Sequence, residues 1–333
     1  MDFISRVFER NIGPQPSVTA KAVDGQEIDT GNDDDRLEIS ATANNRNGYA
    51  EAVGLDSSTA NTGSGDDVVR IRAHADGLST NAWAMRDSEL NTDSGHDRVD
   101  IQGNALRSRI LTGDGGDTVT ISGHETNQVH VDTGASDDIL KVDGGTAITY
   151  VTGDGSDQLQ LTRNYFNSLV EAGKADEGAN QGDPLMVEDF TTGAGGDSFN
   201  CDDILLGHAV GLKRQSVFAD GFLSIKQQGK DSILFFDADG ADKQASSELA
   251  LVVFKGVQAA EFSSENLDSR LINHDDFLLS QHNQKGLDLT SEVFTGSSQH
   301  SHGISQPQPW QAVMTEMDPL ELHNTLQPSN ELV

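Results

Sequence analysis

The sequence predicts an all-β fold: a parallel β-roll, or β-helix solenoid, followed by a β-rich cap domain. Three observations lead to this prediction. Hydrophobic residues make up 35% of the 333 residues and aromatic residues only 5%, which is too few large side chains for an ordinary globular core. Thirty-four glycines indicate many tight turns. One short motif also recurs in frame, which is typical of repeat proteins with a thin core of small aliphatic side chains.

The repeated motif is a Thr-Gly turn that ends in Asp and leads into a strand. It reads T-G-x-x-x-D-x-U-x-U, where U is aliphatic, and only the third copy breaks the second position, with Asp93. Successive copies start 32, 30, 20, 21 and 19 residues apart. The x-U-x-U part alternates with period two and therefore predicts a strand with one buried face. The copies begin at Thr30, Thr62, Thr92, Thr112, Thr133 and Thr152.

The segments between the motifs complete each repeat. The stretches NQVHVD (127–132) and AITYV (147–151) read as short strands, so that a repeat of about 20 residues holds two strands and two turns. The first two repeats are longer and contain similar extra stretches at 49–62 and 81–92. For these repeats we expect a third strand or a projecting loop.

Charge restricts the class of partner. Asp and Glu number 54 against 22 Lys and Arg, for a formal net charge of −32. This charge opposes compaction and repels nucleic acid and anionic membranes, so nucleic acid is not an expected partner. Either the chain is disordered or a cation neutralises it on folding. The carboxylates cluster at fixed turn positions, which favours the cation.

The six turns predict several bound Ca²⁺ ions. Small residues expose backbone carbonyl oxygens around a tight turn, and the sixth-position Asp adds a hard carboxylate oxygen. Calcium takes about six to eight oxygens, more than one turn offers, so neighbouring turns would share an ion. The alternative is that these aspartates merely favour turn backbone. The candidate ligands are Thr30, Asp33, Asp35, Thr62, Gly63, Gly65, Asp67, Thr92, Gly95, Asp97, Thr112, Gly113, Gly115, Asp117, Thr133, Ser136, Asp138, Thr152, Gly155, Asp157 and, in a later glycine-rich turn, Asp197.

These turns are similar to the nonapeptide repeat G-G-x-G-x-D-x-U-x of RTX (hemolysin-type) proteins, a calcium-binding parallel β-roll motif. Thr replaces the first Gly throughout, Asp33 and Ser136 replace the fourth-position Gly, and the turns do not recur every nine residues. The family's Asp falls on Asp35, Asp67, Asp97, Asp117, Asp138 and Asp157.

The second half resembles the C-terminal target domain of type I secretion over roughly residues 187–262. The segment VEDFTTGAGGDSFNCDDILLG (187–207) is similar to the start of that domain, and residues 221–257 to its end: two alternating strands, an Asp-rich turn and a final apolar strand. This resemblance implies export from a Gram-negative bacterium by the type I secretion machinery, through an uncleaved C-terminal signal. It implies a secreted or cell-surface protein. The matching residues are Asp189, Phe190, Gly193, Gly195, Gly196, Asp197 and 203–205 at the start, and Asp237, Asp239 and Asp242 in the turn.

The chain therefore divides into five segments. Phe3, Ile4, Val7 and Phe8 predict one face of a short helix that plugs the open end of the roll. The segment MDFISRVFER has no uninterrupted apolar run, and no stretch reaches the ~20 apolar residues of a membrane-spanning helix. The segments are an N-terminal cap segment (1–24), an RTX-like β-roll (25–163), a connection (164–184), a β-rich type I secretion domain (185–267) and a flexible tail with the export signal (268–333).

Four other features each have two interpretations. Cys201, in an expected strand, reads as a packed thiol and not as a nucleophile. Trp83, placed where the other long repeat has Glu51, is either a sugar-stacking platform or a packing residue. The pair Asp237 and Asp239 forms an extra calcium loop or a plain hairpin turn. The fourth feature is the pair His300 and His302, which reads as solvated tail and not as a transition-metal site.

The leading hypothesis is a non-enzymatic extracellular protein that folds on calcium and has a structural, adhesive or matrix role. A cell-surface or matrix polysaccharide is then an expected partner. The alternative is a polysaccharide-active parallel β-helix enzyme of the alginate epimerase or lyase type, or a module of one. No Walker loop, G-x-S-x-G, H-E-x-x-H or dinucleotide fingerprint occurs in the sequence. The absence of a long apolar segment also argues against a pore-forming toxin.

Overall fold

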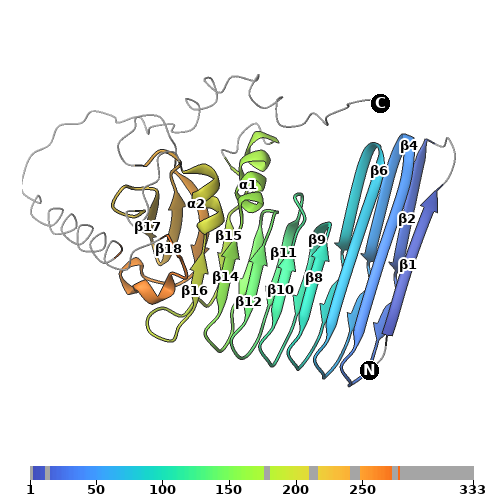
Figure 1. Ribbon diagram of the computed structural model, residues 1–333, viewed down its shortest axis with the longest axis horizontal. Coiled ribbons are helices and arrows are strands. Elements are labelled where there is room, and N and C mark those ends of the chain that lie inside the picture. The colour runs from blue at the N-terminus through green and yellow to red at the C-terminus, as the bar shows by residue number, and fades with distance from the viewer. Residues whose placement is uncertain are drawn as a thin grey trace, which may run out of the picture.

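Most strands pair in parallel with the corresponding strands of the next repeat, so that the repeats lie side by side (Figure 1). The computed structural model describes residues 3–11, 16–175, 181–209, 217–240, 248–271 and 277. Within these residues the chain is mostly β-strand, and two α-helices occur. The expectation of an all-β fold is confirmed.

The strands occupy the following ranges. Those of the repeats are β1 (Phe3–Asn11), β2 (Ser17–Asp24), β3 (Glu27–Asp29), β4 (Arg36–Asp56), β5 (Thr59–Asn61), β6 (Val68–Arg86), β7 (Glu89–Asn91), β8 (Arg98–Gln102), β9 (Asn104–Leu111), β10 (Thr118–Ile121), β11 (Asn127–Asp132), β12 (Ile139–Val142), β13 (Ile148–Val151) and β14 (Gln158–Leu161). They are followed by β15 (Leu185–Val187), β16 (Ser198–Asn200), β17 (Leu223–Gln228), β18 (Asp231–Phe236) and β19 (Leu249–Phe254).

Three parallel ladders run through the repeats. The first joins β1, the first parts of β4 and β6, and then β8, β10, β12, β14 and β16. The second joins β2, the second parts of β4 and β6, and the start of β9. The third joins β3, β5, β7, the end of β9, β11, β13, β15 and β19. Within each ladder, a strand therefore pairs with the equivalent strand of the next repeat.

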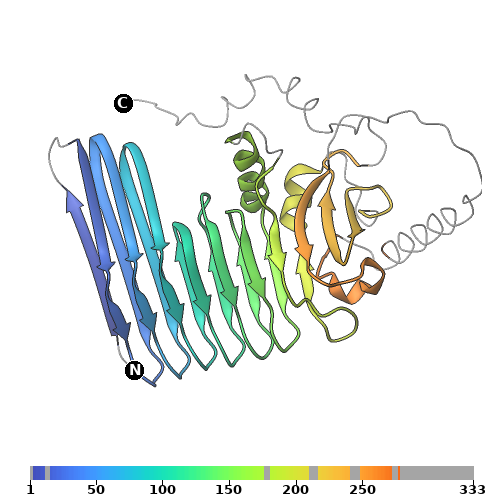
Figure 2. The same cartoon turned by 180° about the vertical axis from the view of Figure 1, so that it is seen from behind.

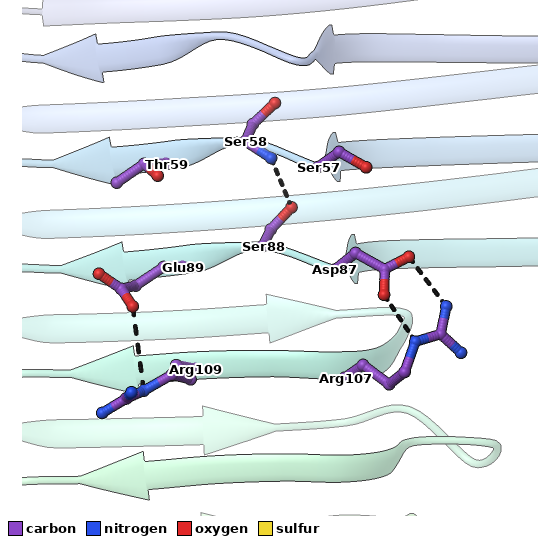
Figure 3. Close-up of a pocket in the computed structure, with 8 residues that line it drawn as sticks. All are labelled: Ser57, Ser58, Thr59, Asp87, Ser88, Glu89, Arg107 and Arg109. Atoms are coloured by element: carbon purple, nitrogen blue, oxygen red, sulfur yellow. Dashed lines mark hydrogen bonds and ion pairs between the residues drawn. The ribbon is translucent and has the colours of Figure 1, made fainter.

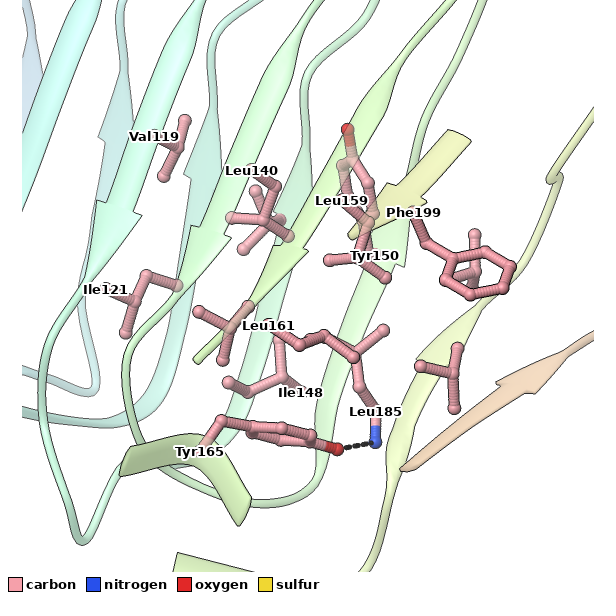
Figure 4. Packing of buried hydrophobic residues seen from close by; sticks show 14 of the residues in the cluster. Val119, Ile121, Leu140, Ile148, Tyr150, Leu159, Leu161, Tyr165, Leu185 and Phe199 are labelled. Atoms are coloured by element: carbon pink, nitrogen blue, oxygen red, sulfur yellow. Dashed lines mark hydrogen bonds between the residues drawn. The ribbon is translucent and has the colours of Figure 1, made fainter. Parts of the chain in front are cut away.

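The aliphatic positions of the motif form the core. They point inward because side chains alternate between the two faces of a strand. The buried Tyr165 connects this core to two later strands. Its hydroxyl donates to the Leu251 carbonyl at 2.6 Å, and it accepts the Leu185 N–H at 2.7 Å (Figure 4). One column, at most 1% exposed throughout, consists of Leu37, Val69, Val99, Val119, Leu140, Leu159 and Phe199.

The longer repeats extend the stack to one side. β4 and β6 have 21 and 19 residues and rise well above the later strands (Figure 1). These repeats also contain the short strands β5 and β7, so the expected third strand is present. The core between the long strands consists of small side chains: Val18, Ala20, Ala41, Ala43, Ala50 and Ala52.

The C-terminal part continues the third ladder. β15 pairs in parallel with β19, which pairs antiparallel with β18, and β18 pairs antiparallel with β17. The two alternating strands and the final apolar strand expected from the sequence are thereby confirmed. The helices α1 (Arg163–Ala175) and α2 (Asp202–His208) lie near the junction with the repeats (Figure 2). α1 falls in the segment expected to be only a connection.

Two local predictions were wrong. Phe3, Ile4, Val7 and Phe8 belong to strand β1 and not to a helix, because β1 pairs with β4 over nine positions and that pairing outweighs a helix of marginal length. Cys201 follows the strand β16 and stands at the N-cap of α2. Its thiol is buried, as expected. In the described part of the chain, no helix has the length and apolar character needed to cross a bilayer.

Candidate metal site

The motif turns are stacked in register. Parallel bridges connect the third position of each turn with that of the next, from Ser64 through Ser94, Asp114 and Ala135 to Asp154. The second and fourth positions adopt positive φ angles, as at Gly113 (89°) and Gly115 (130°). A Cβ on Gly115 would lie 1.7 Å from the Gly95 carbonyl oxygen, so neighbouring turns leave no room for a side chain there.

The two departures from glycine keep the same backbone. Asp93 at the second position has a φ of 66° and Ser136 at the fourth position has a φ of 92°. Asp33 of the first turn is exposed and does not share the positive φ. The first turn is therefore the least regular of the six.

The sixth-position aspartates form one buried column. None is more than 3% exposed, and the backbone N–H of each donates to Oδ1 of the next aspartate along the stack, at 2.7–3.0 Å. The structure thus brings together the sixth-position aspartates of the six motifs and Asp197 of the later turn, which was also a predicted ligand. This aspartate column consists of Asp35, Asp67, Asp97, Asp117, Asp138, Asp157 and Asp197.

The second carboxylate oxygen, Oδ2, of the five central aspartates is left without a hydrogen-bond partner in the described part of the chain. This oxygen is buried in each of them. A buried carboxylate oxygen without a partner is costly, so each one calls for a proton or a cation. The five residues are Asp67, Asp97, Asp117, Asp138 and Asp157.

Burial raises the pKa of these carboxyl groups. It brings the pKa of Asp97 and that of Asp138 to about 7, and it also raises the pKa of Asp117. The hydroxyl of Thr92 partly offsets this rise in the pKa of Asp97, although the hydrogen bond of that hydroxyl goes to the Thr112 carbonyl at 3.3 Å. The column therefore holds negative charge poorly near neutral pH unless a positive ion compensates it.

The first-position threonines form hydrogen bonds to the next repeat. The hydroxyl of Thr112 donates to the carbonyl of Thr133 at 3.1 Å, and that of Thr133 donates to the carbonyl of Thr152 at 3.0 Å. The same bond joins Thr30 to Thr62 at 3.2 Å. These three hydroxyls were predicted as calcium ligands, and in this structure they connect one repeat to the next.

Sequence reasoning missed an outer row of acids at the fifth position. The N–H of Asp66 donates to Asp34 Oδ1 at 3.0 Å, and the N–H of Ser156 donates to Asp137 Oδ1 at 2.9 Å. In the third turn His96 takes this place, and its Nδ1 accepts the Gly116 N–H at 2.9 Å. The signal was present, because three of the six motifs end in a doubled Asp.

The remaining candidates lie elsewhere. Asp237 Oδ1 accepts the N–H groups of Asp239 and Gly240, which is the geometry of a tight turn. Trp83 is partly buried and pairs with Val53, not with Glu51 as the sequence alignment suggested. Asp242, His300 and His302 fall outside the described residues.

The column differs from a site made of clustered side chains. Over the described ranges, no group of three or more His, Cys, Asp or Glu side chains could hold a metal ion, because each turn contributes one inward carboxylate. An ion would depend on backbone oxygens as well. Some of these backbone oxygens already accept hydrogen bonds. The Asp114 N–H donates to the Asp93 carbonyl, and the Gly95 N–H donates to the Asp114 carbonyl, each at 2.8 Å. A carbonyl oxygen has a second lone pair for an ion.

No family model matches this chain, and no curated protein matches it.

Proposed function

We propose that this chain is a secreted calcium-binding β-roll protein of the RTX type, which closes its solenoid when calcium enters the turns. The observation that carries the proposal is the row of buried Oδ2 atoms without a hydrogen-bond donor. A serine hydroxyl in place of the carboxylate would leave no second oxygen to satisfy. A buried oxygen that repeats once per turn fits a row of divalent cations better than an isolated structural contact does.

The residues of this chain would divide the work. The aspartate column presents one carboxylate oxygen per turn, and the left-handed backbone at Gly113 and Gly115 turns carbonyl oxygens toward the neighbouring repeat. Calcium would supply the positive charge that lets the carboxylates stay ionised. The backbone bonds between turns would then set the spacing of the oxygens.

The same chemistry supports export in an unfolded form. With a net charge of −32, the chain repels itself where calcium is scarce, as in the cytosol. Outside the cell, the free energy of calcium binding would drive folding. Residues 185–267 would act as the type I secretion domain and 268–333 would carry the export signal. The folded roll would then serve a structural, adhesive or matrix role at the surface of a Gram-negative bacterium.

A calcium titration followed by circular dichroism tests the proposal. We expect β-signal to appear cooperatively at roughly 0.1 to 1 mM calcium, the range of extracellular calcium modules. Asp117→Asn should raise the midpoint, because it weakens a ligand but keeps the acceptor for the Asp97 N–H. Asp114→Asn is the matched control, since Asp114 is exposed in the same turn and loses the same charge. A fold unaffected by chelator, or equal midpoints for both variants, would count against the proposal.

A further inference from the structure

A second line of turns, away from the aspartate column, contains an open hollow of about 280 Å³. It extends over three successive repeats and lies at the corner between the second and third ladders (Figure 3). Each repeat contributes two side chains to its wall. They are Ser57 and Thr59, Asp87 and Glu89, and Arg107 and Arg109.

The floor of this groove is rigid. Below it lies a serine column of Ser58, Ser88 and Ser108, each at most 6% exposed. Each hydroxyl accepts an N–H from the preceding repeat at 3.1–3.3 Å and donates to a carbonyl of its own repeat at 2.6–2.9 Å. These hydrogen bonds fix the corner from which the wall residues project.

The corner backbone directs the wall side chains outward. Ser57, Asp87 and Arg107 have φ angles of 50°, 51° and 46°, in the left-handed region that residues other than glycine rarely adopt. The same left-handed backbone continues at the matching corner positions of the next two repeats, Gln128 (55°) and Ala147 (51°), so it is a regular feature of this corner along the stack. The groove therefore has an ordered wall as well as a rigid floor.

Charges in the groove cancel in pairs. Arg107 donates from Nε and Nη2 to the two carboxylate oxygens of Asp87, at 2.6 and 2.8 Å. Arg109 lies more loosely beside Glu89, with Nε 3.9 Å from Oε2, and both side chains are well exposed at 57% and 42%. The guanidinium and carboxylate of this second pair can thus turn toward a ligand that offers both acceptors and donors.

These features select a ligand class. The chain carries a net charge of −32, which repels polyanions, and the groove adds no excess positive charge. A pair of hydroxyls, a pair of carboxylates and a pair of guanidinium groups follow one another along the stack, at the strand spacing of about 4.8 Å. Sugar hydroxyls both donate and accept hydrogen bonds and so match this mixed lining.

From these observations we infer that the groove binds a neutral oligosaccharide laid across the three repeats. The inference rests on the proposed extracellular role and deepens it by naming the ligand class and the residues that meet it. The loosely paired Glu89 and Arg109 make the main polar contacts, and the hydroxyls of Ser57 and Thr59 line the opposite end.

The test measures binding of neutral cello-, manno- and malto-oligosaccharides to the full chain by calorimetry in calcium-containing buffer. Circular dichroism first establishes that the protein is folded, so a failure of calcium-dependent folding is seen separately. The double variant Glu89→Ala/Arg109→Ala keeps the net charge and should weaken binding at least about tenfold. Thr59→Phe, which fills the hollow without removing charge, should weaken binding as well.

The matched control is Lys226→Ala/Glu248→Ala, which removes an exposed ion pair of the cap, outside the groove. It should bind as the unaltered chain does. Absence of binding to every neutral oligosaccharide, or binding that survives both groove variants, would overturn the inference. Tighter binding of a uronate oligosaccharide than of any neutral one would overturn the assignment of ligand class.

Discussion

The aspartate column and the serine column solve the same geometric problem with different chemistry. In both, a buried side-chain oxygen accepts the backbone N–H of the corresponding residue one repeat earlier. Ser88 uses its hydroxyl completely, because it also donates to the Arg86 carbonyl at 2.7 Å. Asp97 satisfies one oxygen and leaves the other buried without a donor.

The difference teaches what a carboxylate adds. If the only requirement were to satisfy one N–H per repeat, a neutral hydroxyl would suffice, as it does in the serine column. The aspartate column accepts the desolvation of a charge in several consecutive repeats. A bound cation would satisfy the extra oxygen. The serine column has no such oxygen, so it serves as an internal reference that calcium should not affect.

The largest expected effect concerns pH: without calcium, mild acid should favour the folded state more than neutral pH does. Burial raises the pKa of Asp97 and of Asp138 to about 7, above the unfolded value of about 3.9. The folded state therefore binds more protons at these two groups, so the stability that they contribute is fully present below pH ~4 and is lost as the pH rises through about 7.

In chelator, the β-signal measured by circular dichroism should thus be greater in mild acid than at neutral pH, where the chain is expected to be unfolded. With saturating calcium the neutral sample should gain most, because calcium binds the ionised carboxylates. A β-signal in chelator that increases with pH would break the comparison between the two columns.

The next effect concerns the close approach of the turns. Gly115→Ala should destabilise the protein by about 3 kcal/mol, because its Cβ would meet the Gly95 carbonyl oxygen and its φ of 130° is unfavourable. Gly116→Ala, in the same turn, would place its Cβ 3.2 Å from its nearest neighbours and should cost much less. Denaturant unfolding in calcium measures both, and equal losses would contradict the stacked geometry.

Removing one hydroxyl from the serine column should have a moderate effect. Ser88→Ala leaves the Ser58 N–H buried without an acceptor and should cost about 1–3 kcal/mol. The loss should be the same just above the calcium midpoint and at saturating calcium, unlike that of Asp117→Asn. Ser57→Ala, at an exposed neighbouring position, is the control. A calcium-dependent loss for Ser88→Ala would remove the distinction between the columns.

The smallest effect is expected in the outer row. Asp66→Asn keeps an acceptor for the His96 N–H and lies at an exposed position, so its stability change should stay within about 0.5 kcal/mol. Its calcium midpoint should also match that of the unaltered chain. A midpoint shift as large as that of Asp117→Asn would place the ion outside the column.

The sequence was sufficient to align the turns, because the x-U-x-U alternation and the fixed place of Asp leave one register. It did not reveal that the aspartates point inward or that one oxygen lacks a partner, since both depend on the neighbouring repeat. The serine column was detectable: Ser58, Ser88 and Ser108 recur at 30 and 20 residues, the same spacing as the turns that follow them. The segment of β1 was predicted as a helix because its apolar spacing fits one. Its pairing with β4, which the sequence alone does not reveal, makes it a strand.

Counting bound ions gives the most direct test of the central claim. Native mass spectrometry of the folded chain, after equilibration with roughly millimolar calcium, should show several calcium ions, and fewer in Asp117→Asn/Asp138→Asn. Asp114→Asn should retain the full number. A folded chain that carries no calcium would contradict the account.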